Sequence, residues 1–82
     1  MNVDTVIQDI LDGKTGYHQF DGSYGRTISN RLLEHGFVGR HTLSYCKKAN
    51  YEIHLIRKSD DLKVDIVVAC LFGLFTEIRV FR

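Results

Sequence analysis

Three segments with the character of β-strands in the second half of this 82-residue chain constrain its fold more than any other feature. Residues 51–58 (YEIHLIRK) and 62–70 (LKVDIVVAC) are rich in β-branched and aromatic residues, and a short polar turn separates them. Residues 74–81 (LFTEIRVF) alternate in the way that is typical of a strand with one buried face. These segments predict an antiparallel meander of three strands, and residues 41–48 (HTLSYCKK) are the candidate for a fourth.

Two helices are expected before these strands. Residues 3–11 carry apolar side chains at the i, i+3, i+4 spacing of a helix that buries one stripe. Within residues 23–37 (SYGRTISNRLLEHGF), the apolar side chains share one side of a second predicted helix. Gly13 and Gly36 suit the left-handed conformation that follows a helix end. The candidate caps at the start of the second helix are Asp21 and Ser23.

The expected fold is therefore α+β, with two N-terminal helices packed on an antiparallel β-meander of three to four strands. A chain of 82 residues closes one small core, so residues 1–82 are expected to form a single domain. No segment reaches the roughly 18 apolar residues that a membrane span needs, and the N-terminus lacks a signal-peptide pattern. We expect a cytoplasmic protein that does not bind membranes.

Residues 13–25 (GKTGYHQFDGSYG) are interpreted as a glycine-hinged bridge between the two helices. The GKT sequence is not a phosphate-binding loop, because Gln8 occupies the position of the required first glycine and a helix precedes the lysine. The aromatic residues make a plain spacer a poor interpretation. Two alternatives stay open for Tyr17, Phe20 and Tyr24: they pin the bridge to the core, or they present a binding surface.

The sequence predicts neither a metal nor a cofactor. His18, His35, His41 and Cys46 form no pair with the close spacing of zinc ligands. Cys46 and His41 fall on opposite faces of a strand, so they do not form a nucleophile and base. Cys46 and Cys70 are read as free thiols. We therefore expect a protein that is not an enzyme.

The leading functional hypothesis is a small non-enzymatic binding protein that modulates or inhibits a protein partner. Compact inhibitors of this size include those that bacteriophages carry against host enzymes or defence systems. The absence of a recognisable catalytic set fits this class, although no motif specifies it. The expected contact residues are Tyr17, Phe20, Tyr24, Arg26 and Arg31.

The alternative hypothesis is a nucleic-acid-binding domain, either a winged-helix-like domain or one that binds through its sheet surface. Basic residues close to Tyr45 and Tyr51 combine charge with rings on which bases can stack. The formal net charge of only +1 gives no overall attraction to phosphate. The residues expected to carry this function are Arg40, Lys47, Lys48, Arg57 and Lys58.

The junction between the last two strands (ACLFGLF) offers only Gly73 as a turn residue. A three-residue hairpin loop around Gly73 would leave Leu71, Phe72 and Phe75 near an exposed tip. Either these side chains fold under a helix and complete the core, or they form an apolar contact surface. The second alternative also makes a homodimer possible, and the sequence leaves the oligomeric state open.

Overall fold

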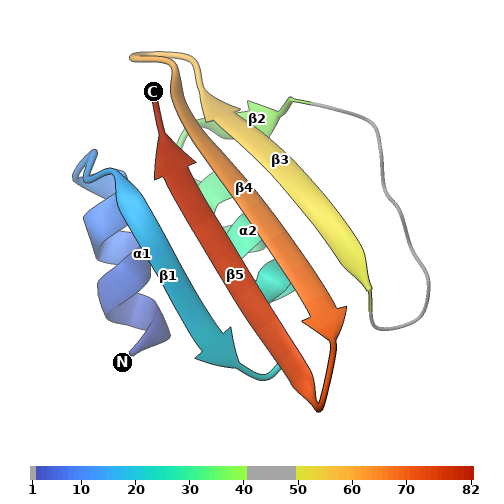
Figure 1. Ribbon diagram of the computed structural model, residues 1–82. Helices are drawn as coiled ribbons and strands as arrows, with labels where there is room; N and C mark the ends of the chain where they lie inside the picture. Colours follow the sequence, from blue (N-terminus) through green and yellow to red (C-terminus); the bar gives the residue numbers. More distant parts are fainter. Residues whose placement is uncertain (1, 41–49) are drawn as a thin grey trace.

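The computed structural model describes residues 2–40 and 50–82, and these residues confirm the α+β class (Figure 1). Two helices alternate with the first strands, and the last three strands follow one another along the chain. The elements are α1 (Val3–Leu11), β1 (Gly16–Asp21), α2 (Gly25–Leu33), β2 (Phe37–Gly39), β3 (Tyr51–Arg57), β4 (Leu62–Cys70) and β5 (Leu74–Phe81).

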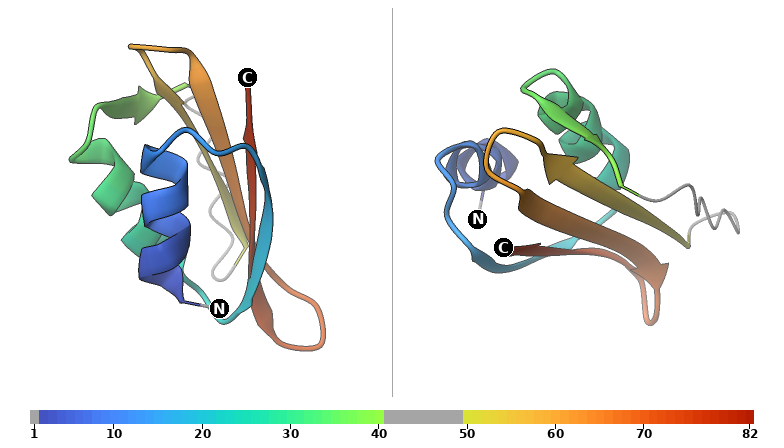
Figure 2. Two further views of the ribbon diagram at one scale, coloured as in Figure 1. Left: turned by 90° about the vertical axis from the view of Figure 1, so that its left-hand side faces the viewer. Right: turned by 90° about the horizontal axis from the view of Figure 1, so that it is seen from above.

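The five strands form one antiparallel sheet in the order β1-β5-β4-β3-β2. Strands β2 to β5 form the meander, and β1 extends the sheet beyond β5. The chain therefore passes from one edge of the sheet to the other through α2. Figure 2 shows both helices on the same side of the sheet.

The prediction of three to four strands was wrong, because the sheet has five. Part of the segment 13–25, which we expected to be a bridge between helices, is strand β1, so the helices do not both precede the sheet. The six residues of β1 include no β-branched residue, and pairing with β5 gives this segment its strand conformation. Strand β2 has only three residues. The candidate strand at 41–48 lies outside the described residues.

The core lies between the helices and one face of the sheet. Alternate residues of the two central strands point into it, as the register of β4 and β5 requires. The helices contribute their apolar stripes, which the spacing in the sequence predicted. The buried apolar side chains are Val6, Ile7, Ile10, Phe20, Ile28, Leu32, Phe37, Tyr51, Leu55, Leu62, Val64, Ile66, Val68, Ile78 and Val80.

One end of the sheet is fastened to the end of α1 by arginine side chains. Arg57 Nη1 donates a 2.8 Å hydrogen bond to the carbonyl oxygen of Leu11, one of the acceptors that a helix end leaves unpaired. Arg57 and Arg82 both bind the Asp60 carboxylate, at 2.7 and 3.1 Å. The hydrogen bonds from Arg57 hold the pKa of Asp60 well below its usual range. Arg57 therefore has a structural role.

The start of α2 is fixed by a buried hydroxyl and a close contact. Thr76, which has no exposed surface, accepts the Tyr24 N–H at 2.9 Å and donates to the carbonyl oxygen of Gly22 at 2.8 Å. Gly25 then lies directly against β3 and β4. A Cβ at this position would come within 2.7 Å of Val68 Cγ2 and 2.8 Å of Tyr51 Oη.

We predict that Gly25→Ala lowers the free energy of unfolding by about 1–3 kcal/mol, because the added methyl group overpacks a buried contact. Gly39→Ala is the matched control, since a Cβ at Gly39 meets no atom within 4 Å. Urea unfolding followed by circular dichroism measures both variants. Equal stability of the two variants would contradict the close approach of α2 to the sheet.

Candidate functional site

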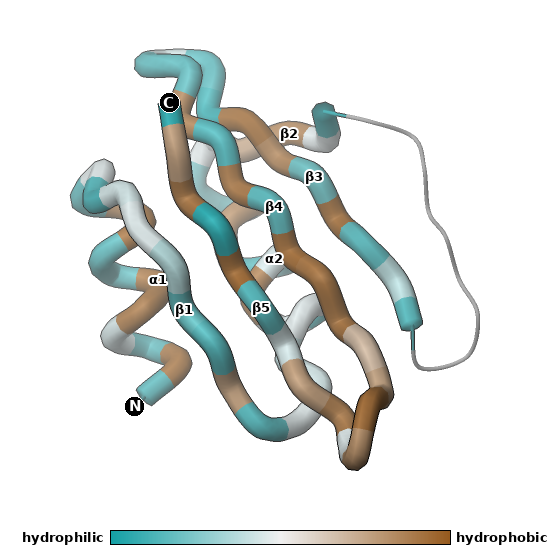
Figure 3. Tube along the Cα trace, in the orientation of Figure 1, coloured by the Kyte–Doolittle hydropathy of each residue, from teal (hydrophilic) through white to brown (hydrophobic). Residues whose placement is uncertain are grey.

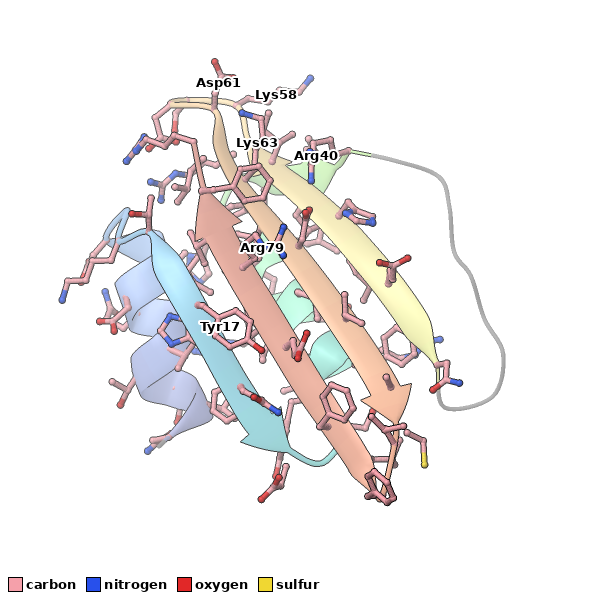
Figure 4. All side chains as sticks on the ribbon, viewed as in Figure 1. Tyr17, Arg40, Lys58, Asp61, Lys63 and Arg79 are labelled. Atoms are coloured by element: carbon pink, nitrogen blue, oxygen red, sulfur yellow. The ribbon has the colours of Figure 1, made fainter. Side chains whose placement is uncertain are left out.

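The face of the sheet opposite the helices carries the candidate site. We call it the outer face; no described helix covers it. The strand register places Tyr17, Arg79, Asp65 and His54 in one row across β1, β5, β4 and β3. Figure 4 shows Tyr17 and Arg79 from this side. The next row is Gln19, Glu77, Val67 and Glu52.

Basic side chains at one end of the outer face are engaged with neighbours in the sheet. The guanidinium group of Arg40 donates to Asp65, and His54 Nδ1 lies 2.7 Å from the same carboxylate oxygen. Arg40 also lies over the Phe81 ring, at 5.5 Å from its centroid, and Lys63 Nζ is 5.9 Å from that centroid. Asp65 offsets the positive charge of Arg40, and the Phe81 ring is already in contact with two cations. This end of the outer face therefore has less free positive charge and less free aromatic surface with which to bind a nucleic acid.

A shallow hollow of about 130 Å³ lies in the middle of the outer face. Its volume is well below the roughly 300 Å³ at which small-molecule sites usually begin. Two carboxylates, Glu52 and Glu77, flank Val67 there. Interaction of the Tyr17 phenol with the Glu77 carboxylate favours the protonated phenol, which raises the pKa of Tyr17 above its usual value. The hollow is lined by Tyr17, Glu52, His54, Asp65, Val67, Glu77 and Arg79.

The turn between β4 and β5, residues 71–73, forms an exposed apolar tip together with the adjoining strand ends at residues 70 and 74; we call this segment the hairpin tip. Figure 3 shows the hydrophobic colour concentrated in this turn. Leu71 is 67% exposed and Phe72 is fully exposed. The alternative in which these two side chains fold under a helix was therefore wrong, whereas Phe75 is half-buried. Phe72 also has a φ of 62°, in the left-handed region of the backbone.

A groove of about 610 Å³, which we call the tip groove, runs from the hairpin tip to β1. Apolar side chains form one part of its lining, and Gln19, Asp21 and Glu77 form the rest. The lining contains two carboxylates and no cation. The lining residues are Gln19, Asp21, Leu71, Phe72, Gly73, Leu74, Phe75 and Glu77.

The predicted protein-contact residues do not form one surface. Tyr17 is exposed on the outer face, while Phe20 is 7% exposed and faces the helices. Tyr24 packs edge-on against Phe20, with ring centroids 5.9 Å apart. Arg26 lies over the Tyr51 ring at 5.1 Å, and Arg31 pairs with Asp4 on α1. Of the five residues, Phe20 and Tyr24 pack against each other.

The residues predicted for nucleic-acid binding are also dispersed. Arg40 pairs with Asp65, and Arg57 pairs with Asp60 at the end of α1. Lys58 is exposed at the turn between β3 and β4 (Figure 4). Lys47 and Lys48 lie outside the described residues. The carboxylate partners of Arg40 and Arg57 reduce the positive charge that these residues contribute.

Sequence reasoning missed the residues of β1 and β5 that line the tip groove, above all Asp21 and Glu77. The apolar junction ACLFGLF was the signal for the tip itself. The pairing of β1 with β5 joins residues more than 50 positions apart, and nothing in the local sequence of β1 indicates this partner. The groove could therefore not be predicted from sequence alone.

Comparison of the chain with protein-family models, with curated proteins and with solved structures finds no match. Among residues 2–40 and 50–82, no group of three or more histidine, cysteine, aspartate or glutamate side chains is placed to hold a metal ion. His41 and Cys46, two of the candidates considered for zinc, lie outside those ranges. No described helix is long and apolar enough to cross a membrane.

We predict that Glu77→Gln brings the pKa of Tyr17 down toward the ordinary value of about 10. The Glu77 carboxylate favours the protonated phenol, and a neutral amide in its place removes the negative charge and leaves only a weaker acceptor, so the pKa falls. A pH titration of the Tyr17 ring resonances by NMR measures the change. Glu52→Gln is the control, because Glu52 lies on the far side of Val67 and its loss should leave this pKa unchanged.

Proposed function

We propose that this protein is a small non-enzymatic binding module that occupies a surface on a protein partner through the hairpin tip and the tip groove. By occupying that surface, the protein inhibits or modulates its partner inside the cell. The main support for this proposal is the conformation of Phe72: its side chain is fully exposed and its backbone is left-handed. Both properties are unfavourable in the isolated chain.

The two costs at Phe72 are independent. A left-handed backbone costs a residue with a Cβ about 1–2 kcal/mol, and a bulky side chain there is a true outlier. The exposed ring gains nothing from the hydrophobic effect until another molecule covers it. Strained and exposed residues of this kind are found where function requires them. Burial of the ring in an apolar pocket of a partner accounts for a phenylalanine at this position.

The surroundings of Phe72 resemble the centre and rim of a protein interface. Leu71 and Leu74 add exposed apolar surface beside the ring. Gln19, Asp21 and Glu77 supply polar groups at the margin of the same groove. Interfaces concentrate their binding energy in a few buried apolar or aromatic anchors inside a polar rim. The hairpin tip offers the anchor, and the groove offers the rim.

The charges of the outer face favour a protein partner over nucleic acid. Strand register puts four carboxylates on this face, and three described cations accompany them. A phosphate backbone would meet net negative charge here. The carboxylates are Asp21, Glu52, Asp65 and Glu77, and the cations are Arg40, Lys63 and Arg79.

We predict that Phe72→Asn lowers affinity for the partner at least tenfold while leaving the chain as stable as the parent or more stable. Asparagine tolerates the left-handed backbone and lacks the apolar ring. A photo-crosslinking amino acid at position 72 would identify the partner, with the same group at Lys58, in the turn at the other end of β4, as the control. Calorimetry with the purified partner then measures the loss of affinity.

Leu33→Asn is the matched variant for this experiment, because Leu33 is also an exposed apolar residue but lies on α2. It should leave the affinity unchanged. Equal affinities of Phe72→Asn and the parent chain would contradict the proposal. A salt titration with short oligonucleotides tests the rival function: tight, salt-sensitive binding that is lost on substituting Lys58 together with Lys47 and Lys48 would favour nucleic acid instead.

A further inference from the structure

We propose that the partner contributes an extended segment with basic and apolar side chains, and that this segment joins the sheet as an added strand beside β1. This inference rests on the proposed function and defines the chemistry of the partner. Three features of the structure support it: the open backbone of β1, the hollows on both sides of that edge, and the charge of their linings.

Among the described strands, β1 is one edge of the sheet and β5 is its neighbour (Figure 1). The Gly22 N–H donates to the carbonyl oxygen of Leu74 at 2.7 Å, and this bond sets the phase of the ladder. In an antiparallel pair, alternate residues direct their backbone groups toward the neighbouring strand. His18 and Phe20 therefore face β5, while Tyr17, Gln19 and Asp21 present their N–H and C=O groups at the open edge.

The open edge lacks the usual protection against strand addition. Natural edge strands are often blocked by lysine, proline or a covering segment. Residues 16–21 contain neither lysine nor proline. In the described part of the chain, no backbone hydrogen bond outside the β1–β5 ladder engages Tyr17, Gln19 or Asp21. The backbone N–H and C=O groups of these three alternate residues of the six-residue strand are thus available for pairing.

Hollows lie on both sides of this edge. The tip groove opens on the outer face and includes Gln19 and Asp21 in its lining. A second hollow of about 300 Å³ is also lined by Gln19 and Asp21, together with Val3, Phe20 and Tyr24 from the helix side. Side chains of a strand alternate between its two faces, so a strand added at this edge would direct successive side chains into the two hollows. Strand-adding recognition sites use this arrangement.

The linings define the side chains that the added strand should carry. The tip groove combines the carboxylates of Asp21 and Glu77 with exposed apolar side chains. Lysine or arginine next to leucine or phenylalanine complements that combination. The helix-side hollow holds the edge-on pair of Phe20 and Tyr24, which suits an apolar side chain. A second copy of β1 fits poorly, because it would bring Asp21 and no cation.

Selection from a library of random eight-residue peptides displayed on the surface of phage tests this inference with the full 82-residue chain as bait. We expect the enriched peptides to have apolar residues at every second position. Lysine or arginine should also occur, at positions that lie on one and the same face of the added strand. Asp21→Asn and Glu77→Gln should each weaken the best peptide several-fold and reduce the dependence of its affinity on salt. Asp61→Asn, in the turn at the opposite end of β4, should do neither (Figure 4).

An N-methyl scan of the best peptide then tests the backbone geometry. In an added strand, only every second N–H points toward β1. Methylation at those positions removes a hydrogen bond and should weaken binding about tenfold, which corresponds to about 1.4 kcal/mol. Methylation at the intervening positions should change the affinity much less. The alternating pattern is the result that a binding mode without strand addition does not produce.

Several results would overturn the inference: uniform effects of methylation, enrichment of acidic peptides, an empty selection, or self-association of the chain through β1. None of these results bears on Phe72. If Phe72→Asn abolishes binding to the crosslinked partner while the peptide results fail, the proposed function stands and the added strand does not. If Phe72→Asn has no effect, the proposed function itself fails.

Discussion

The main constraint on this molecule is that its two nine-residue helices lie on the same side of a five-stranded sheet (Figure 2). They therefore bury one face of the sheet and leave the other face uncovered by any described helix. Every buried residue of β4 has the same parity, and the other parity faces outward. The chain has no further described helix with which to cover the second face. An antiparallel sheet tolerates such a face when its side chains are polar or paired with each other. The outer face follows this rule near the turn between β3 and β4, and it departs from the rule near the turn between β4 and β5.

The two ends of the sheet differ in how their side chains are satisfied. Near the turn between β3 and β4, Arg57 and Arg82 bind Asp60, and Arg57 closes the end of α1. Near the turn between β4 and β5, Phe72 is exposed in a strained conformation and the adjacent groove carries unbalanced negative charge. The first end uses its polar contacts to hold the fold together. The second end has the features of a binding surface, whose exposed apolar and charged side chains would find partners in a complex.

The sequence was most informative where structure is local. The β-branched and aromatic composition of residues 51–58 predicted β3, the alternation in residues 62–70 and 74–81 predicted β4 and β5, and the apolar spacing in residues 3–11 predicted α1. The apolar junction around Gly73 predicted an exposed tip as one of two alternatives, and exposure of Leu71 and Phe72 decided between them. These features depend on neighbours within a few residues, which a pattern can show.

The remainder of the site depends on contacts between distant parts of the chain. Strand β1 has no β-branched residue, and its conformation comes from pairing with β5. The same pairing brings the residues of the tip groove together. Because side chains alternate along β1, Phe20 and Tyr17 lie on opposite faces of the sheet, and the expected aromatic surface does not form. Arg57 was grouped with basic residues on the basis of sequence proximity, but its side chain binds Asp60 and Leu11. Such assignments require knowledge of the tertiary contacts.

Residue-resolved amide hydrogen exchange, compared between the chain alone and its complex with the crosslinked partner, tests the central claim most directly. The account predicts that Tyr17, Gln19 and Asp21 exchange rapidly in the chain alone because their N–H groups lie at the open edge. It further predicts that these amides and those of the hairpin tip become protected in the complex. Protection confined to the helices, or to the turn between β3 and β4, would contradict it.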